Sequence, residues 1–155
     1  MADFSKRIQE LKLILPKPPQ PVGAYQPVVM AGNIAYLSGQ ISRTADGKIL
    51  TGKIGGALTL EQGQEGAKVA VLNVISLIQN LVGPRFERIL RIVGYVQCEP
   101  SFKDIHLVMN PASELLQAVF GEKGIHARSA VGMASLPLDA CVEIEATVQV
   151  HSGQS

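Results

Sequence analysis

Residues 128–144 read Arg128-Ser129-Ala130-Val131-Gly132-Met133-Ala134-Ser135-Leu136-Pro137-Leu138-Asp139-Ala140-Cys141-Val142-Glu143-Ile144. This stretch predicts two β-strands joined by a turn at residues 136–139, where proline and aspartate favour a turn. The second strand continues to Val150, with apolar residues alternating with polar ones. Because successive side chains of a strand point to opposite faces, one face of the sheet is expected under other elements. The other face is polar, and it is either solvated or joins an oligomer.

Arg128 opens this stretch, and Glu143 follows fifteen positions later. A guanidinium at the start of an otherwise apolar strand needs an anion, and its planar fork suits a carboxylate through two parallel hydrogen bonds. Two interpretations follow. Arg128 binds the carboxylate of a ligand, with Glu143 as the complementary acidic group of the site. Alternatively, the two residues form a structural ion pair at a strand end or a subunit contact.

Apolar residues at helical spacing and period-two segments predict the remaining elements. Helices are expected over residues 3–14, from the capping box of Thr59 and Gln62 to Gly83-Pro84, and from Asn110 as N-cap to Gly121. Strands are expected over residues 26–31, 34–39 and 89–98. Together these elements predict an α+β domain, in which two helices pack on one face of a mixed sheet.

The N-terminal part is expected to stand apart from this domain. Phe4, Ile8, Leu11 and Ile14 would share one face of the helix over residues 3–14. Four prolines make residues 16–21 a stiff, extended connector. We therefore divide the chain into an N-terminal helix with its connector, residues 1–21, and a main domain, residues 22–151. Within the main domain, residues 42–58 are expected to form a long loop that is functional or packs against a neighbour.

The composition argues against several classes of function. A charged fraction of 17% and a net charge of +1 in 155 residues do not favour binding of nucleic acid through a basic surface. No apolar stretch approaches the roughly twenty residues that span a bilayer. Residues 1–7 lack the pattern of a signal peptide. We therefore expect a soluble protein of the cytoplasm that binds neither nucleic acid nor membrane.

The cysteines and histidines do not indicate a metal site. Cys98 and Cys141 lie far apart in apolar segments, as expected for buried thiols in a reducing compartment. His106, His126 and His151 show no metal-ligand spacing with the cysteines or with each other. His126, two residues before Arg128, is expected in a solvated loop.

Several short motifs occur in a characteristic order along the chain. They are Val22-Gly23-Ala24-Tyr25, Leu37-Ser38-Gly39-Gln40-Ile41, Asn110, Ala127-Arg128-Ser129, Leu136-Pro137 and Val142-Glu143-Ile144-Glu145-Ala146. With these motifs, residues 22–150 resemble the RidA/YjgF family of enamine/imine deaminases, formerly called endoribonuclease L-PSP. The N-terminal extension and the loop at residues 42–58 resemble a longer branch of that family.

The resemblance implies both a fold and an activity. It implies a chorismate-mutase-like α+β domain and a homotrimer with one active site at each subunit interface. It also implies hydrolysis of 2-imino acids to 2-oxo acids and ammonia, without a metal or an organic cofactor. Arg128 would hold the substrate carboxylate, and Glu143, kept ionised by the arginine, would position the attacking water. The matching substrate-binding positions are Tyr25, Ser38, Gly39, Ala130 and Asn110.

Ala130 departs from the best-known deaminases of the family, which have cysteine at this position. The expected contact is through the backbone, so the chemistry should survive while the substrate range shifts. Three residues also have structural interpretations: Tyr25 as a packing residue, Ser38 as a turn former and Asn110 as a helix cap.

One alternative function is a non-catalytic regulatory protein that binds a small carboxylate. Ribonuclease activity has little support, because the sequence has no histidine pair and no clustered basic face with aromatics. Fold alone would also allow a chorismate mutase.

Overall fold

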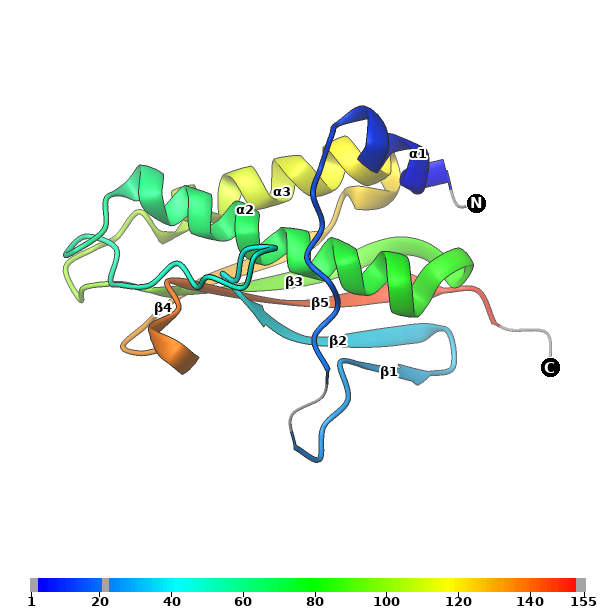
Figure 1. The fold of residues 1–155 in the computed structure, drawn as a ribbon, viewed down its shortest axis with the longest axis horizontal. Helices are drawn as coiled ribbons and strands as arrows, with labels where there is room; N and C mark the ends of the chain where they lie inside the picture. The colour runs from blue at the N-terminus through cyan, green and yellow to red at the C-terminus, as the bar shows by residue number, and fades with distance from the viewer. Residues whose placement is uncertain (1–2, 21–22, 153–155) are drawn as a thin grey trace.

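The structure is a computed structural model that describes residues 3–20 and 23–152, and its helices cover one face of a sheet (Figure 1). The main elements are α1 (Asp3–Glu10), β1 (Val28–Ala31), β2 (Ile34–Ile41), α2 (Leu60–Leu77), β3 (Phe86–Gln97), α3 (Ile105–Phe120), β4 (Ala127–Met133) and β5 (Val142–Val150). Short helical turns follow α2 and α3, and another, Pro137–Asp139, connects β4 to β5. The predicted α+β class and the two helices on one face are confirmed.

Among the described residues the sheet has five strands in the order β1-β2-β5-β3-β4. All neighbours are antiparallel except β3 and β4, so the sheet is mixed as predicted. The turn at residues 136–139 does not close a hairpin, because β3 lies between the two strands it joins. Gln97 of β3 holds this turn: its Nε2 donates to Asp139 Oδ1 at 2.7 Å, and its Oε1 accepts from the Leu136 N–H at 2.7 Å.

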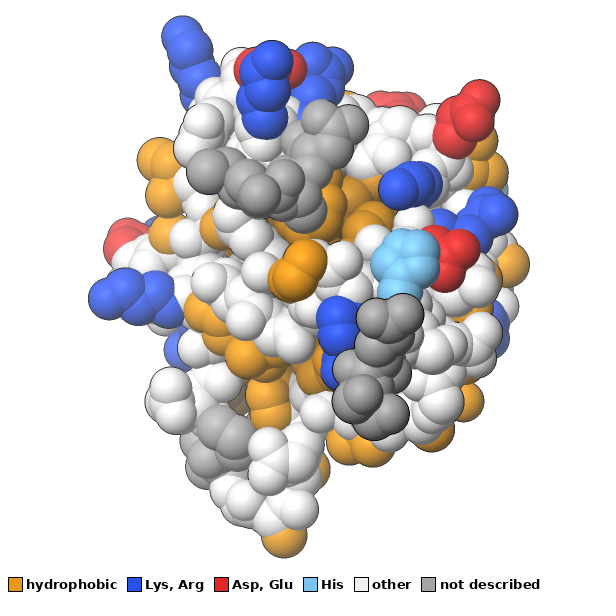
Figure 2. All heavy atoms as spheres, turned by 90° about the vertical axis from the view of Figure 1, so that its right-hand side faces the viewer, with side chains coloured by type: hydrophobic (Ala, Val, Ile, Leu, Met, Phe, Trp, Pro, Cys, Tyr) orange, Lys and Arg blue, Asp and Glu red, His pale blue; other side chains and the backbone are white. Residues whose placement is uncertain are grey.

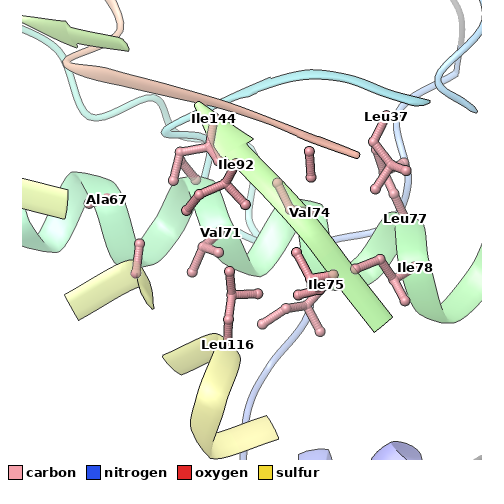
Figure 3. Close-up of a cluster of buried hydrophobic side chains, with 14 of the residues drawn as sticks. Leu37, Ala67, Val71, Val74, Ile75, Leu77, Ile78, Ile92, Leu116 and Ile144 are labelled. Carbon is pink, nitrogen blue, oxygen red and sulfur yellow. The ribbon is translucent and has the colours of Figure 1, made fainter. Parts of the chain in front are cut away.

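The core lies between the sheet and the two long helices, where Val71 and Ile75 of α2 lie among side chains of β3, β5 and α3 (Figure 3). Helix α2 begins with the predicted capping box. The Gln62 N–H donates to Thr59 Oγ1 at 3.2 Å, and the Thr59 N–H donates to Gln62 Oε1 at 2.9 Å. A cap of this kind stabilises a helix by about 1 kcal/mol.

With its following turns, α2 forms a helical segment, Leu60–Arg85, that is long and apolar enough to cross a membrane. The expectation that no apolar stretch approaches this length is therefore wrong. In the structure 67% of the apolar window is buried, and α2 packs against α3 and β5. The apolar character of α2 thus follows from its place in the core, as is usual for a helix that is covered on most sides.

The predicted N-terminal helix exists but is shorter than residues 3–14. Helix α1 ends at Glu10, and Lys12 adopts a left-handed backbone conformation (φ 53°) that stops the helix before Pro16. Phe4 and Ile8 are buried as predicted, whereas Ile14 is 76% exposed and does not share their face. The connector then passes α2, where Ser76 Oγ donates to the Pro16 carbonyl at 2.5 Å. The proposed domain boundary at Pro21 and Val22 lies outside the described residues.

Helix α3 begins at Ile105, so the prediction of a helix start at Asn110 is wrong. Pro111 lies inside the helix and has no N–H to donate to the Leu107 carbonyl, a bond whose loss normally disrupts a helix. Gln64 of α2 replaces the missing donor, because its Nε2 donates to the Leu107 carbonyl at 2.9 Å. A contact from a distant helix thus allows α3 to continue through the proline.

The second face of the sheet is not covered by any helix of residues 3–20 and 23–152 (Figure 1). The alternation along β5 confirms the sequence prediction, with Val142, Ile144, Ala146, Val148 and Val150 buried. The uncovered face also carries apolar side chains: Val29 is 54% exposed, Tyr36 53% and Val131 40%. It is therefore less polar than β5 alone predicts.

Candidate functional site

Arg128 and Glu143 lie on opposite faces of the sheet. Arg128 is in register with Ile92 of β3, which is buried beneath the helices. Glu143 is in register with Tyr95, three residues further along β3, and therefore belongs to the uncovered face. An ion pair between the two residues within one chain is excluded. The pairing that the sequence suggested requires two subunits.

The side chain of Arg128 lies against α3, where three neutral acceptors hold it. Its Nη1 donates to Asn110 Oδ1 at 3.1 Å and to Ser113 Oγ at 3.2 Å, and its Nη2 donates to the His106 carbonyl at 3.3 Å. No carboxylate lies within 4.0 Å of the guanidinium in the part of the chain that the structure describes. The charge of Arg128 is therefore oriented but not neutralised, and N–H groups remain for an anion.

Ser113 and His126 extend this hydrogen-bonded network. His126 Nδ1 lies 2.6 Å from the Gly124 carbonyl, so it carries the proton and donates. Its Nε2, 3.0 Å from Ser113 Oγ, is then the acceptor for the serine hydroxyl. His126 lies in the loop before β4, as expected, but it is only partly exposed and is hydrogen-bonded through both ring nitrogens, so it is not a freely solvated side chain. We call Arg128, Asn110, Ser113 and His126 the Arg128 cluster. The sequence signal for Ser113 was its position three residues after Asn110, on the same helix face.

Glu143 lies in a different place, beside an irregularity in β2. The pairing of β2 with β5 shifts between Leu37 and Gln40, next to Gly39. A Cβ atom at Gly39 would lie 2.9 Å from Glu143 Cδ, so any other residue here would displace the carboxylate. The spacing of the Ser38-Gly39 motif from Glu143 in the sequence gives no sign of this close approach.

Ser38 forms hydrogen bonds to the segment that precedes β1, at Gln26 and Pro27. Its hydroxyl donates to the Gln26 carbonyl at 2.7 Å, and its N–H donates to the Pro27 carbonyl at 2.9 Å. These bonds fit the structural interpretation of Ser38, and its contact with a ligand stays a prediction. They also position Tyr25, which is 55% exposed and lines a cavity instead of packing in the core.

This cavity, of about 410 Å³, surrounds Glu143, and we call it the Glu143 pocket. It is lined by Lys17, Pro19, Gln20, Tyr25, Pro27, Gly39, Gln40, Ile41, Arg43, Asn73, Pro137, Leu138 and Glu143. Arg128, Asn110 and Ala130 are not among the lining residues. The side chain of Ala130 is partly buried and packs against the core, and the expected contact of its backbone with a ligand stays a prediction. Within one chain the predicted site residues therefore fall into two separate groups, one around Arg128 and one around Glu143.

The environment of Glu143 differs from the one expected. Burial raises the pKa of Glu143 above its ordinary value, and the neighbouring charge of Glu145 raises it further. Arg128, which was expected to keep Glu143 ionised, lies on the opposite face of the sheet in the same chain. Glu145 itself accepts a hydrogen bond from the Tyr95 hydroxyl at 2.7 Å, and this bond raises the pKa of Tyr95. Glu143 is therefore a stronger base than an exposed glutamate.

A larger cavity, about 820 Å³, lies at the other end of the molecule, between α1 and the end of α3. None of the predicted site residues lines it. Its Arg7 is paired with Glu10 at 3.2 Å, and its His151 lies 3.5 Å from Glu87. On this face basic and acidic side chains are interspersed, without a continuous basic patch (Figure 2). Size alone therefore does not make this cavity the functional site.

Residues 3–20 and 23–152 contain no group of three or more His, Cys, Asp or Glu side chains that could hold a metal ion. The absence of a metal in the reaction stays a prediction. Cys98 and Cys141 are free and buried, as expected, and burial raises the pKa of both thiols. A raised pKa leaves little thiolate, so neither cysteine is suited to act as a nucleophile.

The fold and the Glu143 pocket define an α+β protein with a mixed five-stranded sheet and a cavity of small-molecule size. Residues 16–150 match the family described as Endoribonuclease L-PSP. The chain therefore belongs to this family, which is the RidA/YjgF family that its motifs resemble.

Two sequence relatives and one solved structure illustrate the similarity. Protein TCP17 of Trypanosoma cruzi is 37% identical over 94% of this chain and 92% of its own length. A 2-iminobutanoate/2-iminopropanoate deaminase of Dermatophagoides farinae is 30% identical over 88% of this chain and 93% of its own length. The crystal structure of Atu1372 from Agrobacterium tumefaciens, a protein of unknown function, superposes with a TM-score of 0.85 at 36% identity. That structure covers 95% of this chain and is itself 93% covered.

Proposed function

We propose that the protein hydrolyses reactive 2-imino acids and their enamine tautomers to 2-oxo acids and ammonia, at sites between the subunits of a homotrimer. One observation carries the proposal: an oriented, unneutralised arginine and a half-buried glutamate with a raised pKa lie on opposite faces of one sheet. Neither group forms a complete site in its own chain. The uncovered sheet face, with its exposed Val29, Tyr36 and Val131, offers a surface on which a second copy can pack.

In this proposal Arg128 of one subunit binds the substrate carboxylate, and the backbone near Ala130 supplies a further hydrogen bond. The carboxylate of Glu143, from the adjacent subunit, accepts a hydrogen bond from a water molecule and directs it to the imine carbon. A carbon–oxygen bond forms as Glu143 takes the proton. With a protonated imine this gives a neutral carbinolamine. Glu143 then gives the proton to the amino nitrogen and the carbon–nitrogen bond breaks. The hydroxyl oxygen becomes the carbonyl of the 2-oxo acid as its proton passes back to Glu143 or to solvent, and ammonia leaves. A raised pKa suits this two-way transfer better than an ordinary one.

Tyr25 and Gly39 have supporting roles. Gly39 leaves room for the Glu143 carboxylate, and Tyr25 lines the same cavity. No step requires a metal or an organic cofactor. The 2-imino acids arise from pyridoxal-phosphate-dependent dehydratases, and we propose that the protein acts where these enzymes work, in the cytoplasm.

The proposal is tested by forming 2-iminopropanoate and 2-iminobutanoate in situ with an amino-acid oxidase and trapping the free imine with semicarbazide. The protein should lower the yield of the trapped product. Arg128→Ala should reduce kcat/KM by roughly 10²–10³-fold, because a buried charge pair is worth about 2–5 kcal/mol. Arg128→Lys should also have a low kcat/KM, because lysine lacks the planar guanidinium that can bind a carboxylate through two hydrogen bonds.

Arg85→Ala, a change at an exposed arginine outside both groups, is the matched control and should retain activity. Imine turnover that survives in Arg128→Ala would refute the assignment of the anchor. A wild-type protein that binds 2-oxobutanoate but turns over neither imine would favour the alternative of a non-catalytic carboxylate-binding protein.

A further inference from the structure

Two cationic side chains line the Glu143 pocket without a part in the proposed hydrolysis. They are Lys17, from the proline-rich connector, and Arg43, from the loop after β2. Neither residue was predicted at a site from the sequence, since the connector and this loop are far from Glu143 along the chain. In the folded chain both segments meet at the cavity that holds the carboxylate.

The backbone of Arg43 is held firmly, while its exposed side chain makes few contacts with the rest of the chain. Asn73 of α2, only 5% exposed, donates through Nδ2 to the Arg43 carbonyl at 2.8 Å. The Arg43 N–H donates to the Ile41 carbonyl at 2.7 Å. The side chain itself makes only a long 3.5 Å bond to the Gly47 carbonyl. The backbone of Arg43 at the pocket is thus positioned by a buried amide.

Lys17 is placed in a similar way by the residues before and after it. The Pro16 carbonyl accepts a hydrogen bond from Ser76, which is 1% exposed, and Pro18 and Pro19 restrict the backbone that follows. Neither Lys17 nor Arg43 has a carboxylate within 4.0 Å among the described side chains. The two charges therefore lack an anionic partner in the described part of the chain.

Glu143 does not serve as that partner. Burial and Glu145 both raise the pKa of Glu143, and neither Lys17 nor Arg43 is among the groups that shift it. The two cations line the same pocket as Glu143 without an ion pair to it, and they can complement an anionic group that comes from outside. The volume of about 410 Å³ is within the range of small-ligand sites, about 300–1,000 Å³, and leaves room for more than the smallest 2-imino acids.

We infer that this protein prefers 2-imino acids whose side chain ends in a second carboxylate. Arg43 and Lys17 bind the distal carboxylate, while Arg128 of the neighbouring subunit binds the carboxylate next to the imine. Arg43 makes the larger contribution, because its fork can hold a carboxylate through two hydrogen bonds, whereas Lys17 is a point charge. This inference rests on the proposed function, since it assigns the substrate class of the same site.

The test compares the imine formed from glutamate by an oxidase with 2-iminobutanoate, in the semicarbazide assay. Arg43→Ala should lower kcat/KM for the dicarboxylic imine about tenfold or more, the effect of losing a charge-assisted bond, and leave 2-iminobutanoate within about twofold. Lys17→Ala should act in the same direction but less strongly. Lys48→Ala is the matched control, because Lys48 is an exposed cation of the same loop that does not line the pocket. Equal losses for both imines, or no preference in the wild type, would overturn the inference.

Calorimetry with the stable products separates this inference from the proposed function. The wild type should bind 2-oxoglutarate about tenfold more tightly than 2-oxobutanoate, and Arg43→Ala should remove the difference. If neither imine is hydrolysed but this binding pattern holds, the hydrolase proposal fails and the selectivity of the pocket stands. If both imines are hydrolysed and the two products bind equally, the selectivity fails and the hydrolase proposal stands. Thermal unfolding of each variant confirms that the chain is folded.

Discussion

The Arg128 cluster and the Glu143 pocket are built in different ways. The cluster uses regular elements: β4 presents Arg128, and one face of α3 supplies its acceptors Asn110 and Ser113. The pocket uses irregular ones: a shift in the pairing of β2, a loop, the connector, and a turn in which Leu138 has a left-handed backbone (φ 57°). Regular elements hold one charged group rigidly, whereas loops shape the space around the other. This difference suits a rigid anchor for one group of the ligand and a separate pocket that selects the rest of it.

Among changes to residues that support the two charged groups, Gly39→Ala is expected to give the largest effect, and it would show how closely the Glu143 pocket is fitted. The new methyl group would lie 2.9 Å from Glu143 Cδ and push the carboxylate away from its position. A displacement of about 1 Å in a catalytic group costs roughly 10²-fold in rate, so kcat should fall by about that factor. The melting temperature, measured beside kcat, should change little. An unchanged kcat would mean that Glu143 has no fixed position in the reaction.

Ser113→Ala tests how the Arg128 cluster is held and is expected to have an intermediate effect. It removes one hydrogen bond to a charged group, worth about 1.5–3 kcal/mol, and leaves the bonds to Asn110 and the His106 carbonyl. We expect KM for the imine to rise about tenfold while kcat stays within about twofold, since Ser113 orients the binding group only. Ser113→Thr should restore KM, and Glu114→Ala, on the exposed side of α3, is the control. A loss confined to kcat would contradict this role.

Glu145→Gln is the smallest change and acts on the pKa of Glu143. Since the negative charge of Glu145 raises that pKa, its removal lowers it. Glu143 then stays ionised to lower pH, so the acid limb of the kcat/KM profile should move to lower pH. The amide oxygen can still accept the Tyr95 hydrogen bond, and the rate at neutral pH should stay within about twofold. An acid limb that moves to higher pH, or not at all, would show that Glu143 is not the titrating group.

The sequence predicted well those features that depend on local pattern. The alternation along β5, the capping box at Thr59 and Gln62, and the mixed α+β class all follow from the period of the residues or a single turn of helix. The same reasoning failed for the start of α3. The side chain of Gln64, which compensates for Pro111, comes from another helix, and no local rule anticipates it.

The separation of Arg128 from Glu143 was beyond sequence reasoning for a related reason. Which face each residue occupies depends on the register of β3 against β4 and β5, and that register is set by the packing of the whole sheet. The cations that line the pocket, Lys17 and Arg43, were missed because the fold of the connector and the loop brings them there. No periodic pattern in the sequence predicts that these two residues lie near Glu143.

The most direct test of a site shared between subunits is complementation of two inactive variants. Arg128→Ala and Glu143→Gln proteins would be purified, mixed in equal amounts, dissociated in mild denaturant and reassociated before the imine assay. If each site takes Arg128 from one subunit and Glu143 from its neighbour, about a quarter of the sites in randomly mixed trimers have both residues intact. Activity should then recover to about a quarter of that of the wild type treated in the same way. If the mixture stays as inactive as either variant alone, the two residues do not act together across an interface, and the account is contradicted.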